Sequence, residues 1–308
     1  MKNLQFLPKF SDRWSHLYLE HGRLEKESDS LAFFTPEGSV EVPIHQLGFL
    51  MLGPGTAVTH AAMDALAENN TLLAWVGEQG VRLYAHSTGG THHSTRLLRQ
   101  ARLFSDRPER LKVVRRMYNK RFPEPVGDDA DLEEVRGKEG YRVREAYRVA
   151  ALEHGVEWKG RHYDPKNWDW SDPLNQALST ANACMYGLCH AAILSAGYSP
   201  AIGFIHTGKM LSFVYDIADL YKTELCVPLA FREAKAGGKD VGRRVRLALR
   251  DEFHKTRLME RILPDIAEVL DARDDLGEDP TELEGLPVTL DDRAKDGGLS
   301  WQSEREDP

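Results

Sequence analysis

Cysteine is scarce in this chain of 308 residues. Its three cysteines are an odd count and too few for a disulfide framework or a closed structural zinc site, so we expect reduced, buried thiols. No uninterrupted apolar run approaches the ~18 residues that a membrane helix needs, and the first residues lack the apolar block of a secretion signal. The P-loop pattern, GxxxxGK followed by Ser or Thr, does not occur either. These absences predict a cytoplasmic protein that has no membrane partner.

The composition is that of a globular protein whose acidic charge is concentrated at one end. Hydrophobic residues make up 41% of the chain, enough for a substantial core, and the length favours two domains. The net charge is -8, but residues 271–308 carry 13 acidic and four basic side chains, so the rest of the chain is close to neutral. Residues 272–308 are also poor in large apolar side chains, and we expect an acidic, largely disordered tail.

Short extended patterns separated by turn residues fill the first 86 residues. The segments LYLEHGRLEKE, SLAFFTPEGSVEVP, LGFLMLG, TLLAWVGE and GVRLYAH alternate or run apolar and are bounded by Gly and Pro. One helix interrupts them, with Thr59 as its N-cap and Asn69 and Asn70 at its end. Residues 1–86 therefore predict a small β domain, and the Gly, Ser and Thr of residues 87–95 predict a linker.

From residue 96 onward the apolar residues repeat at helical spacing. The segment 174–196 is apolar or small on every side, which predicts a central buried helix that ends at Gly197 and Pro200. The fold class is therefore α+β and multidomain, with the β domain followed by an all-α domain over residues 96–271. A helical segment broken at Pro108 comes first, and the further helices are expected at 131–154, 174–196, 210–223, 228–236, 241–256 and 258–271.

Basic residues cluster in two segments of the nearly neutral body, residues 96–121 and 232–257. Such segments indicate an electrostatic footprint for a polyanion, because the local field steers a charged ligand more than the net charge does. Solvated helix faces are the alternative.

Glu139 is the first candidate for chemistry. On a helix it shares a stripe with Val143, Tyr147 and Ala150, so its carboxylate points with the apolar face. A buried carboxylate is costly without a partner. It is therefore bound to a metal, paired with Arg136 or Arg142, or protonated.

A second candidate set lies in AIGFIHTGKMLSFVYDIADLYK. His206 ends an apolar run, and Asp216 and Asp219 are three residues apart on the following helix, which places them on one face. Two like charges raise each other's pKa unless a cation lies between them. Three arrangements would relieve this repulsion: a divalent metal between the carboxylates, pairing with the nearby Lys209 and Lys222, or exposure of both carboxylates to solvent on a polar face.

Glu139, His206 and Asp219, with Asp216 near, form a set of hard oxygen ligands and one imidazole, which favours Mg²⁺ or Mn²⁺. Such a metal beside basic helices suits phosphoryl transfer, so the residues point to a metal-dependent nuclease or transesterase.

Other candidates are weaker. His92 and His93 are expected in solvent, and Cys184, Cys189 and His190 point apart on the buried helix. A dense aromatic group is either a core anchor or a base-stacking platform. Its members are Trp158, Tyr163, Trp168 and Trp170.

Six blocks in order resemble the CRISPR-associated integrase, the Cas-one endonuclease family, in its type I-E form. They are GVRLYA, RGKEG, GRHYDPKNW, SPAIGFIHTGK, LSFVYDIADLYK and RRVRLALRD. The resemblance covers roughly residues 4 to 271, and nothing carries over to the tail.

The resemblance implies a helical catalytic domain with Mg²⁺ or Mn²⁺ held by Glu139, His206 and Asp219 and supported by Asp216. It implies homodimers, two of which flank a dimer of the smaller Cas-two protein. The complex captures a short foreign DNA duplex and inserts it at the CRISPR repeat by attack of a 3′-hydroxyl on a phosphodiester. The DNA contacts that it implies are Arg82, Tyr163, Tyr186, Lys209, Tyr215, Arg243, Arg246 and Arg250.

Two positions depart from the family pattern. His21 stands where a tyrosine stacks on the end of the captured duplex, and Ala57 replaces an arginine. The first departure bears on capping of the duplex end, and the second on one contact to DNA or to a neighbouring subunit.

Two rival hypotheses stand beside the integrase: a structure-selective nuclease for branched DNA or RNA that uses the same metal, and a catalytically idle scaffold that only binds a partner and duplex.

Overall fold

The computed structural model describes residues 17–28, 30–69, 71–77, 83–87, 94–121, 127, 132–160, 172–237, 240–271, 288–290 and 293–295. The chain divides into two compact units, Met1–Ala272 and Arg273–Pro308. In the second unit, β9 (Val288–Leu290) and β10 (Arg293–Lys295) pair as an antiparallel ribbon. The sequence did not predict this ribbon, and the remainder of the expected disordered tail lies outside the described residues.

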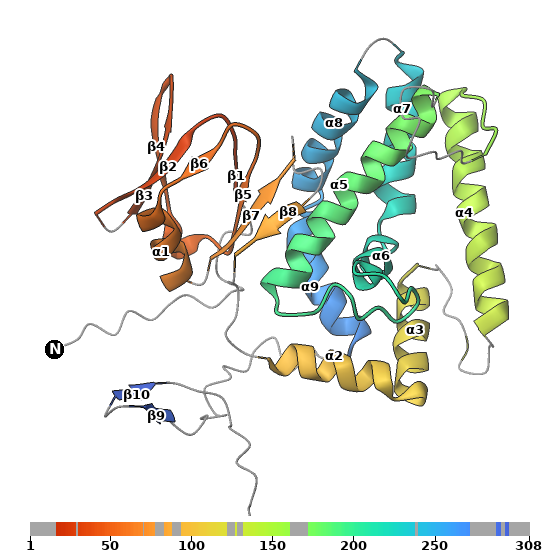
Figure 1. Ribbon diagram of the computed structural model, residues 1–308. Helices are drawn as coiled ribbons and strands as arrows, with labels where there is room; N and C mark the ends of the chain where they lie inside the picture. Colours follow the sequence, from red (N-terminus) through yellow and green to blue (C-terminus); the bar gives the residue numbers. More distant parts are fainter. Residues whose placement is uncertain are drawn as a thin grey trace, which may run out of the picture. The chain divides into compact units, whose positions relative to one another are not determined.

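The N-terminal region of the first unit contains two four-stranded sheets (Figure 1). One has the order β4-β3-β2-β6, with β2 and β3 antiparallel and β6 parallel to β2. The other has the order β1-β5-β7-β8, in which β1, β5 and β7 are parallel and β8 is antiparallel. The strands span Leu17–Leu19 (β1), Arg23–Glu27 (β2), Ser30–Thr35 (β3), Gly38–Val42 (β4), Phe49–Leu52 (β5), Ala57–Val58 (β6), Leu72–Val76 (β7) and Leu83–His86 (β8).

Helix α1, His60–Glu68, begins and ends where the sequence predicts. Thr59 Oγ1 accepts a hydrogen bond from the Ala62 amide, which satisfies one of the free N–H groups of the first turn, and Asn69 is the C-cap. The helix lies in the connection between β6 and β7. The crossover from β5 through this helix explains why β5 and β7 run parallel.

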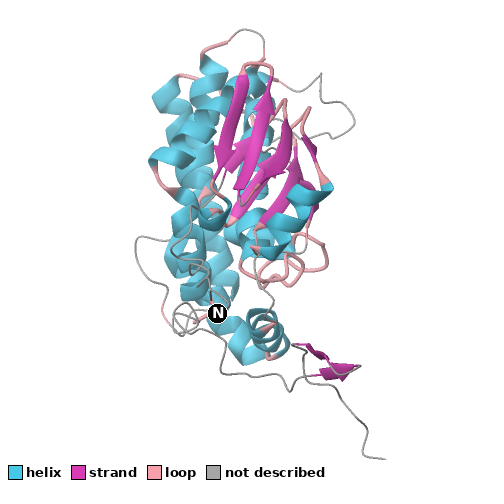
Figure 2. Cartoon of the chain, turned by 90° about the vertical axis from the view of Figure 1, so that its left-hand side faces the viewer, coloured by secondary structure: helices cyan, strands magenta, loops and turns pink. Residues whose placement is uncertain are grey.

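Strand β5 explains the uninterrupted apolar run LGFLMLG. Phe49 and Met51 belong to the core cluster that includes the helices, whereas Leu50 and Leu52 belong to a second cluster with α1 and the other sheet. Because side chains alternate along a strand, a strand buried on both faces is apolar at every position. Strands of this sheet lie against the helices (Figure 2), and α5 packs against β7 and β8. One core cluster thus spans the predicted β and helical domains.

The helical region follows the predicted order. Its elements are α2 (Thr95–Ser105), α3 (Arg107–Arg121), α4 (Leu132–His154), α5 (Pro173–Ser195), α6 (Ser212–Ala218), a π-helical turn η5 (Lys222–Cys226), α7 (Val227–Lys235), α8 (Val241–Lys255) and α9 (Leu258–Val269). The helix expected at 210–223 is shorter than predicted, because α6 ends at Ala218 and the π-helical turn follows it.

Helix α5 is the central buried helix that the sequence predicts. It is long and apolar enough to cross a membrane, but it packs against α6, α7, α8 and α9, and most of its residues are buried in the core. Asp172 caps its N-terminus by accepting hydrogen bonds from the Leu174 and Asn175 amides. Gly197 follows it with a positive φ of 77°, a conformation that favours glycine at a helix end.

Candidate functional site

The segment before α6, residues 199–211, which we call the His206 loop, is folded around one buried carboxylate. The backbone N–H groups of Phe204, Ile205 and His206 donate to Asp216 at 2.6, 3.1 and 2.9 Å. The His206 Nδ1 also lies 2.7 Å from an Asp216 oxygen. Several N–H donors that converge on one carboxylate fix both the carboxylate and the backbone that carries the donors. Asp216 therefore organises the loop, and both of its oxygens are used for this.

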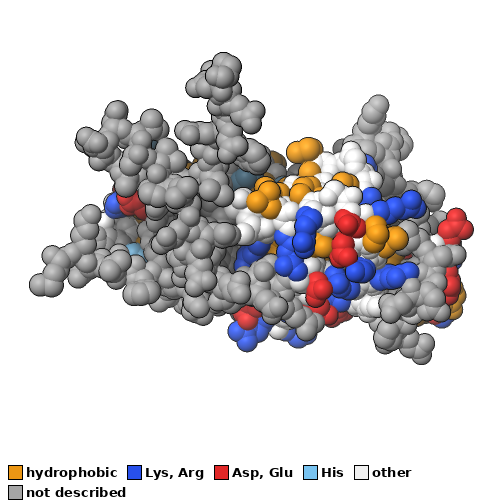
Figure 3. Space-filling model, turned by 90° about the horizontal axis from the view of Figure 1, so that it is seen from below, with side chains coloured by type: hydrophobic (Ala, Val, Ile, Leu, Met, Phe, Trp, Pro, Cys, Tyr) orange, Lys and Arg blue, Asp and Glu red, His pale blue; other side chains and the backbone are white. Residues whose placement is uncertain are grey.

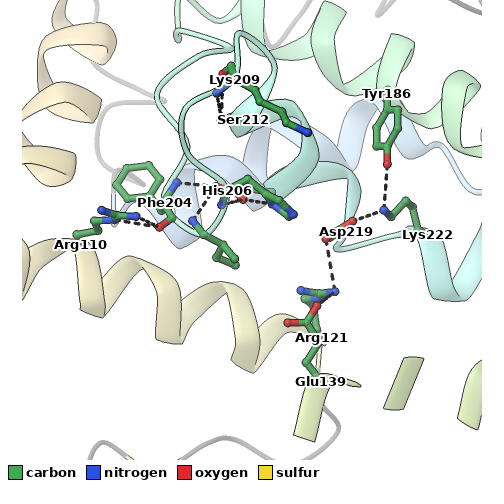
Figure 4. A network of polar contacts seen from close by, with 12 residues as sticks. Arg110, Arg121, Glu139, Tyr186, Phe204, His206, Lys209, Ser212, Asp219 and Lys222 are labelled. Atoms are coloured by element: carbon green, nitrogen blue, oxygen red, sulfur yellow. Dashed lines mark hydrogen bonds and ion pairs between the residues drawn. The ribbon is translucent and has the colours of Figure 1, made fainter. Parts of the chain in front are cut away.

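Two side chains from α2 and α3 hold the same loop from outside. The buried Gln100 amide donates to the carbonyls of Ser199 and Ile202 at 3.0 and 2.9 Å and accepts from the Ser199 amide at 2.8 Å. The Arg110 Nε and Nη2 donate to the Phe204 carbonyl at 2.9 and 2.7 Å (Figure 4). The loop is thus fixed on both sides, and this determines where His206 lies.

Close packing at Gly203 fixes the loop further. A Cβ at this position would lie 2.4 Å from the His206 carbonyl oxygen and 2.7 Å from the Ser212 backbone. No side chain fits there without moving the start of α6. Ser212 caps the turn, because its hydroxyl donates to the Lys209 carbonyl at 2.8 Å and accepts from the Lys209 amide at 3.1 Å.

Glu139 and Asp219 come from separate helices and meet at one arginine. The Arg121 guanidinium, at the end of α3, is in ion-pair contact with Glu139 and lies 3.8 Å from Asp219 Oδ2 (Figure 4). The sequence offered Arg136 or Arg142 as one possible answer for Glu139, beside a metal or a proton. The side chain of Arg136 lies outside the described residues, and the ion pair that the structure shows is with Arg121, which the sequence did not offer. Arg136 and Arg142 lie along the same helix as Glu139, whereas Arg121 comes from α3.

Lys222 approaches Asp219 from the other side. Its ammonium is in ion-pair contact with Asp219 Oδ1 and donates to the Tyr186 hydroxyl at 3.2 Å. Burial, the largest single influence, lowers the pKa of Lys222, but the charges and hydrogen bonds of Asp219 and Tyr186 together outweigh it, and the net pKa is raised. Lys222 is the first residue of the π-helical turn. One of the two lysines that the sequence offered as counter-ions is therefore confirmed.

The His206 imidazole lies at the exposed side of this group. The hydrogen bond to Asp216 raises the pKa of His206, and the charges of Asp216 and Asp219 add to this effect. When Nδ1 carries the proton that Asp216 accepts, Nε2 has a free lone pair for a ligand. Tyr215 lies edge-on to His206 at 5.8 Å between ring centroids and to Tyr186 at 5.0 Å.

The expected shared face of Asp216 and Asp219 requires correction. Asp216 is turned into the His206 loop, and Asp219 lies beyond the end of α6, between Arg121 and Lys222. Both carboxylates are buried, so a solvated polar face is excluded. The two like charges are separated by different partners, and no metal is needed to keep them apart.

The donor set fits a hard divalent ion, although its carboxylates hold other cations. In the part of the chain that the structure describes, no three His, Cys, Asp or Glu side chains converge as they stand on a common metal position. Asp219 Oδ1 is buried and has no partner there besides the Lys222 ammonium. An oxygen from each of Glu139 and Asp219, with an imidazole beside them, is the donor chemistry that Mg²⁺ and Mn²⁺ accept.

The basic segment 96–121 is mainly structural. Most of its cations bind carbonyl or carboxylate groups of other elements. These side chains are therefore neither fully solvated nor free to bind a polyanion. On the face in Figure 3, Lys and Arg are interspersed with acidic and hydrophobic side chains. The cations with such partners are Arg96 (Ala196 carbonyl), Arg99 (Asp271 carbonyl), Arg110 (Phe204 carbonyl), Arg116 (Val269 carbonyl, Asp271), Lys120 (Asp265, Glu268) and Arg121 (Glu139).

The second basic segment presents more charge to solvent. Arg243 and Arg250 are exposed about two turns apart along α8, with Arg246 half-buried between them. Arg250 pairs with Asp251 at 2.8 Å. Lys209 is exposed on the His206 loop.

The expected DNA contacts Arg82 and Tyr163 lie outside the described residues, as do His92, His93, Trp168 and Trp170. Trp158 is a core anchor, because it stacks on Tyr147 at 4.6 Å and packs against Phe231. Cys184, Cys189 and Cys226 are buried and free, as predicted, and burial raises the pKa of each thiol.

Three residues of the site were missed from the sequence. Arg121 was counted only as one of ten clustered cations, and nothing in its spacing marks it as the partner of Glu139. Gln100 and Arg110 gave no signal either, because their partners are backbone carbonyls about a hundred residues away. Such contacts follow from helix packing and have no local pattern.

Comparison with known proteins agrees with the fold and shows the family. The family model described as CRISPR associated protein Cas1 matches residues 17–124 and 119–239, and the chain belongs to this family. CRISPR-associated endonuclease Cas1 2 of Thermus thermophilus is 49% identical over 291 residues, covering 92% of this chain and 90% of that protein. The Escherichia coli endonuclease Cas1 is 44% identical over 287 residues, covering 91% and 94%.

A solved structure is similar over most of the chain. The crystal structure of a TtCas1-DNA complex has 50% sequence identity and a TM-score of 0.77, and the match covers 86% of this chain and 99% of that one. N-terminal strands followed by a helical region are therefore the architecture of this family.

Proposed function

We propose that the protein is a Cas1 integrase of the type I-E form, which inserts captured DNA segments into a CRISPR repeat. In the reaction, a DNA 3′-hydroxyl attacks a phosphodiester of the repeat, the new ester bond forms, and the old 3′ oxygen leaves. Family membership and the endonuclease names of the relatives support this reaction class. The observation that carries the proposal is the meeting of Glu139 and Asp219 beside an imidazole that Asp216 orients.

Glu139, His206 and Asp219 would hold Mg²⁺ or Mn²⁺. The bound ion supplies a Lewis acid that polarises the phosphodiester and offsets charge on the leaving oxygen. The protein's own residues position the ligand side chains. Asp216 keeps the Nδ1 proton of His206 facing inward, and the His206 loop, fixed by α2 and α3, presents the other imidazole edge outward.

Double-stranded DNA is the substrate, as both captured segment and repeat. The similar crystal structure contains DNA, which supports DNA binding by this chain as well. Tyr186 and Tyr215 adjoin His206, which suits a 3′ end placed at the site. Exposed Lys209, Arg243 and Arg250 suit phosphate contacts, with Arg246, Arg82 and Tyr163 as further contacts from the resemblance. The working assembly is a pair of homodimers on a Cas2 dimer.

The second candidate is a nuclease for branched DNA that uses the same site without integration. The endonuclease names of the relatives favour cleavage as such and do not require a joined product. An idle scaffold is less favoured, because ordering two carboxylates around buried cations is costly and DNA binding does not need it.

A strand-transfer assay tests the proposal. The protein, with and without Cas2, is incubated with a 3′-hydroxyl duplex and supercoiled repeat DNA in Mn²⁺, Mg²⁺ or EDTA. We expect joined product with either ion and none in EDTA. Glu139→Gln, His206→Ala and Asp219→Asn should abolish it. Glu145→Gln is the matched control, since Glu145 lies on the same helix and pairs with Arg148 away from the site. Cleavage without joining would favour the nuclease, and equal activity of all variants would end the assignment.

A further inference from the structure

Arg121 is a buried cation between two carboxylates of different helices. Its side chain is 8% exposed, and its guanidinium contacts Glu139 of α4 and approaches Asp219 at the end of α6 (Figure 4). The guanidinium also lies 6.0 Å from the centre of the Tyr118 ring. Arg121 therefore belongs to the core and to the site at once.

The electrostatics of the pair explain why a cation is needed. Two carboxylates held near each other in a partly dry site repel, and either their pKa rises or a positive charge lies between them. Arg121 supplies that charge without any bound ion, and Lys222 supplies another on the far oxygen of Asp219. The charge of Arg121 also contributes to a lowered pKa of Arg142, although burial is the larger cause. The site is thus already neutralised by the chain itself.

We propose that Arg121 is a resident cation that competes with the divalent ion for Glu139 and Asp219. It keeps the carboxylates of α4 and α6 together before an ion binds, and an ion binds by taking over oxygen atoms that Arg121 contacts. This inference rests on the metal centre of the proposed function. It assigns Arg121 as a positioning residue that lowers metal affinity and stabilises the metal-free protein.

Mn²⁺ binding to the full-length protein tests this directly. Isothermal titration and thermal unfolding in EDTA and in Mn²⁺ are compared for the parent, Arg121→Met, Arg121→Lys and Lys120→Met. Lys120 is the matched control: it is the preceding residue of α3 and pairs with Asp265 and Glu268 at 2.8 and 2.9 Å, away from Glu139. Arg121→Met keeps an unbranched side chain about as long as the aliphatic part of arginine but removes the guanidinium and its charge.

Arg121→Met should bind Mn²⁺ about tenfold more tightly than the parent, since couplings between close charge pairs reach this size. Its melting temperature should be lower than the parent's in EDTA and should rise more on adding Mn²⁺. Lys120→Met should bind Mn²⁺ as the parent does. Equal or weaker Mn²⁺ binding by Arg121→Met would overturn the proposal.

Arg121→Lys keeps the test valid if the methionine variant does not fold. Its ammonium lacks the planar fork of the guanidinium and is expected to hold the two carboxylates less firmly. Mn²⁺ affinity should therefore still increase, and an unchanged or lower affinity overturns the proposal. Glu139→Gln distinguishes failure of the proposed metal centre from failure of the competition by Arg121. If Mn²⁺ binds to neither parent nor Arg121 variants, and Glu139→Gln changes nothing, the metal centre fails. If Mn²⁺ binds equally to the parent and to both Arg121 variants but more weakly to Glu139→Gln, only the competition by Arg121 fails.

Discussion

Asp219 lies between the positive charges of Arg121 and Lys222. Its carboxylate is therefore expected to stabilise the metal-free protein, whereas the sequence alone suggested that it has no effect or destabilises it. From the sequence, Asp219→Ala relieves repulsion between neighbouring carboxylates and leaves the metal-free protein unchanged or more stable. In the structure its removal leaves two largely buried cations without their shared partner. A buried cation that loses its partner is strongly destabilising.

We therefore expect Asp219→Ala to lower the free energy of unfolding by about 2 kcal/mol in EDTA, a value reduced from that of a fully buried pair because the site is partly open. Urea unfolding measures it. The control is Asp251→Ala, which removes an exposed carboxylate paired with Arg250 and should change stability by less than about 0.5 kcal/mol. Unchanged or increased stability of Asp219→Ala would restore the repulsion argument.

Asp216 acts on the site through His206. In Asp216→Asn an amide group that donates would face the N–H groups that now donate to the carboxylate. We expect strand transfer to fall about 10- to 100-fold, as is usual when the partner of a metal-binding histidine is lost. The ¹⁵N shifts of the His206 ring should change with it. Transfer within twofold of the parent, with unchanged ring shifts, would show that Asp216 does not position His206.

At the scale of elements, α2 and α3 serve as the support of the His206 loop. Arg110 gives the Phe204 carbonyl two N–H donors, and such charged hydrogen bonds contribute about 1.5 to 3 kcal/mol each. Arg110→Met should therefore increase amide hydrogen exchange at Phe204, Ile205 and His206 by about tenfold or more.

Mass spectrometry of exchanged peptides checks this result. Lys112→Met is the matched control, because Lys112 is exposed on the same helix and pairs with Glu109 one turn away. Equal exchange in the Arg110 variant and the parent would mean that Asp216 and Gln100 suffice to hold the loop.

At the scale of the whole molecule, the two basic segments differ in exposure, and we expect them to differ in their contribution to DNA binding. Each phosphate that a protein neutralises adds about 0.9 to the slope of log affinity against log salt. Arg243→Gln with Arg250→Gln should therefore reduce the slope for duplex DNA by about 1.8. The surface pair of Arg250 with Asp251 is too weak to prevent such a contact.

Fluorescence anisotropy at several salt concentrations measures the slope. The control removes two exposed charges from α3, Arg107→Gln with Lys112→Gln, and should leave the slope unchanged. If the α3 variant flattens the slope as much as the α8 variant, the first basic segment is also part of the DNA surface.

Features that depend on neighbouring residues could be predicted from the sequence. Thr59 begins α1 and Gly197 ends α5 because caps act within one turn, and the all-round apolar character of α5 is visible in its own residues. The candidate residues Glu139, His206, Asp216 and Asp219 were also recognisable, through their place in ordered sequence blocks.

Partners across the fold could not be predicted in this way. Arg121 of α3 meets Glu139 of α4 and Asp219 at the end of α6, and the direction of each side chain depends on how the whole core packs. The parallel pairing of β5 with β7 and the use of Gln100 and Arg110 as supports have the same origin. Ion pairs and hydrogen bonds between distant segments depend on distances of a few ångströms, and only the packed chain defines these.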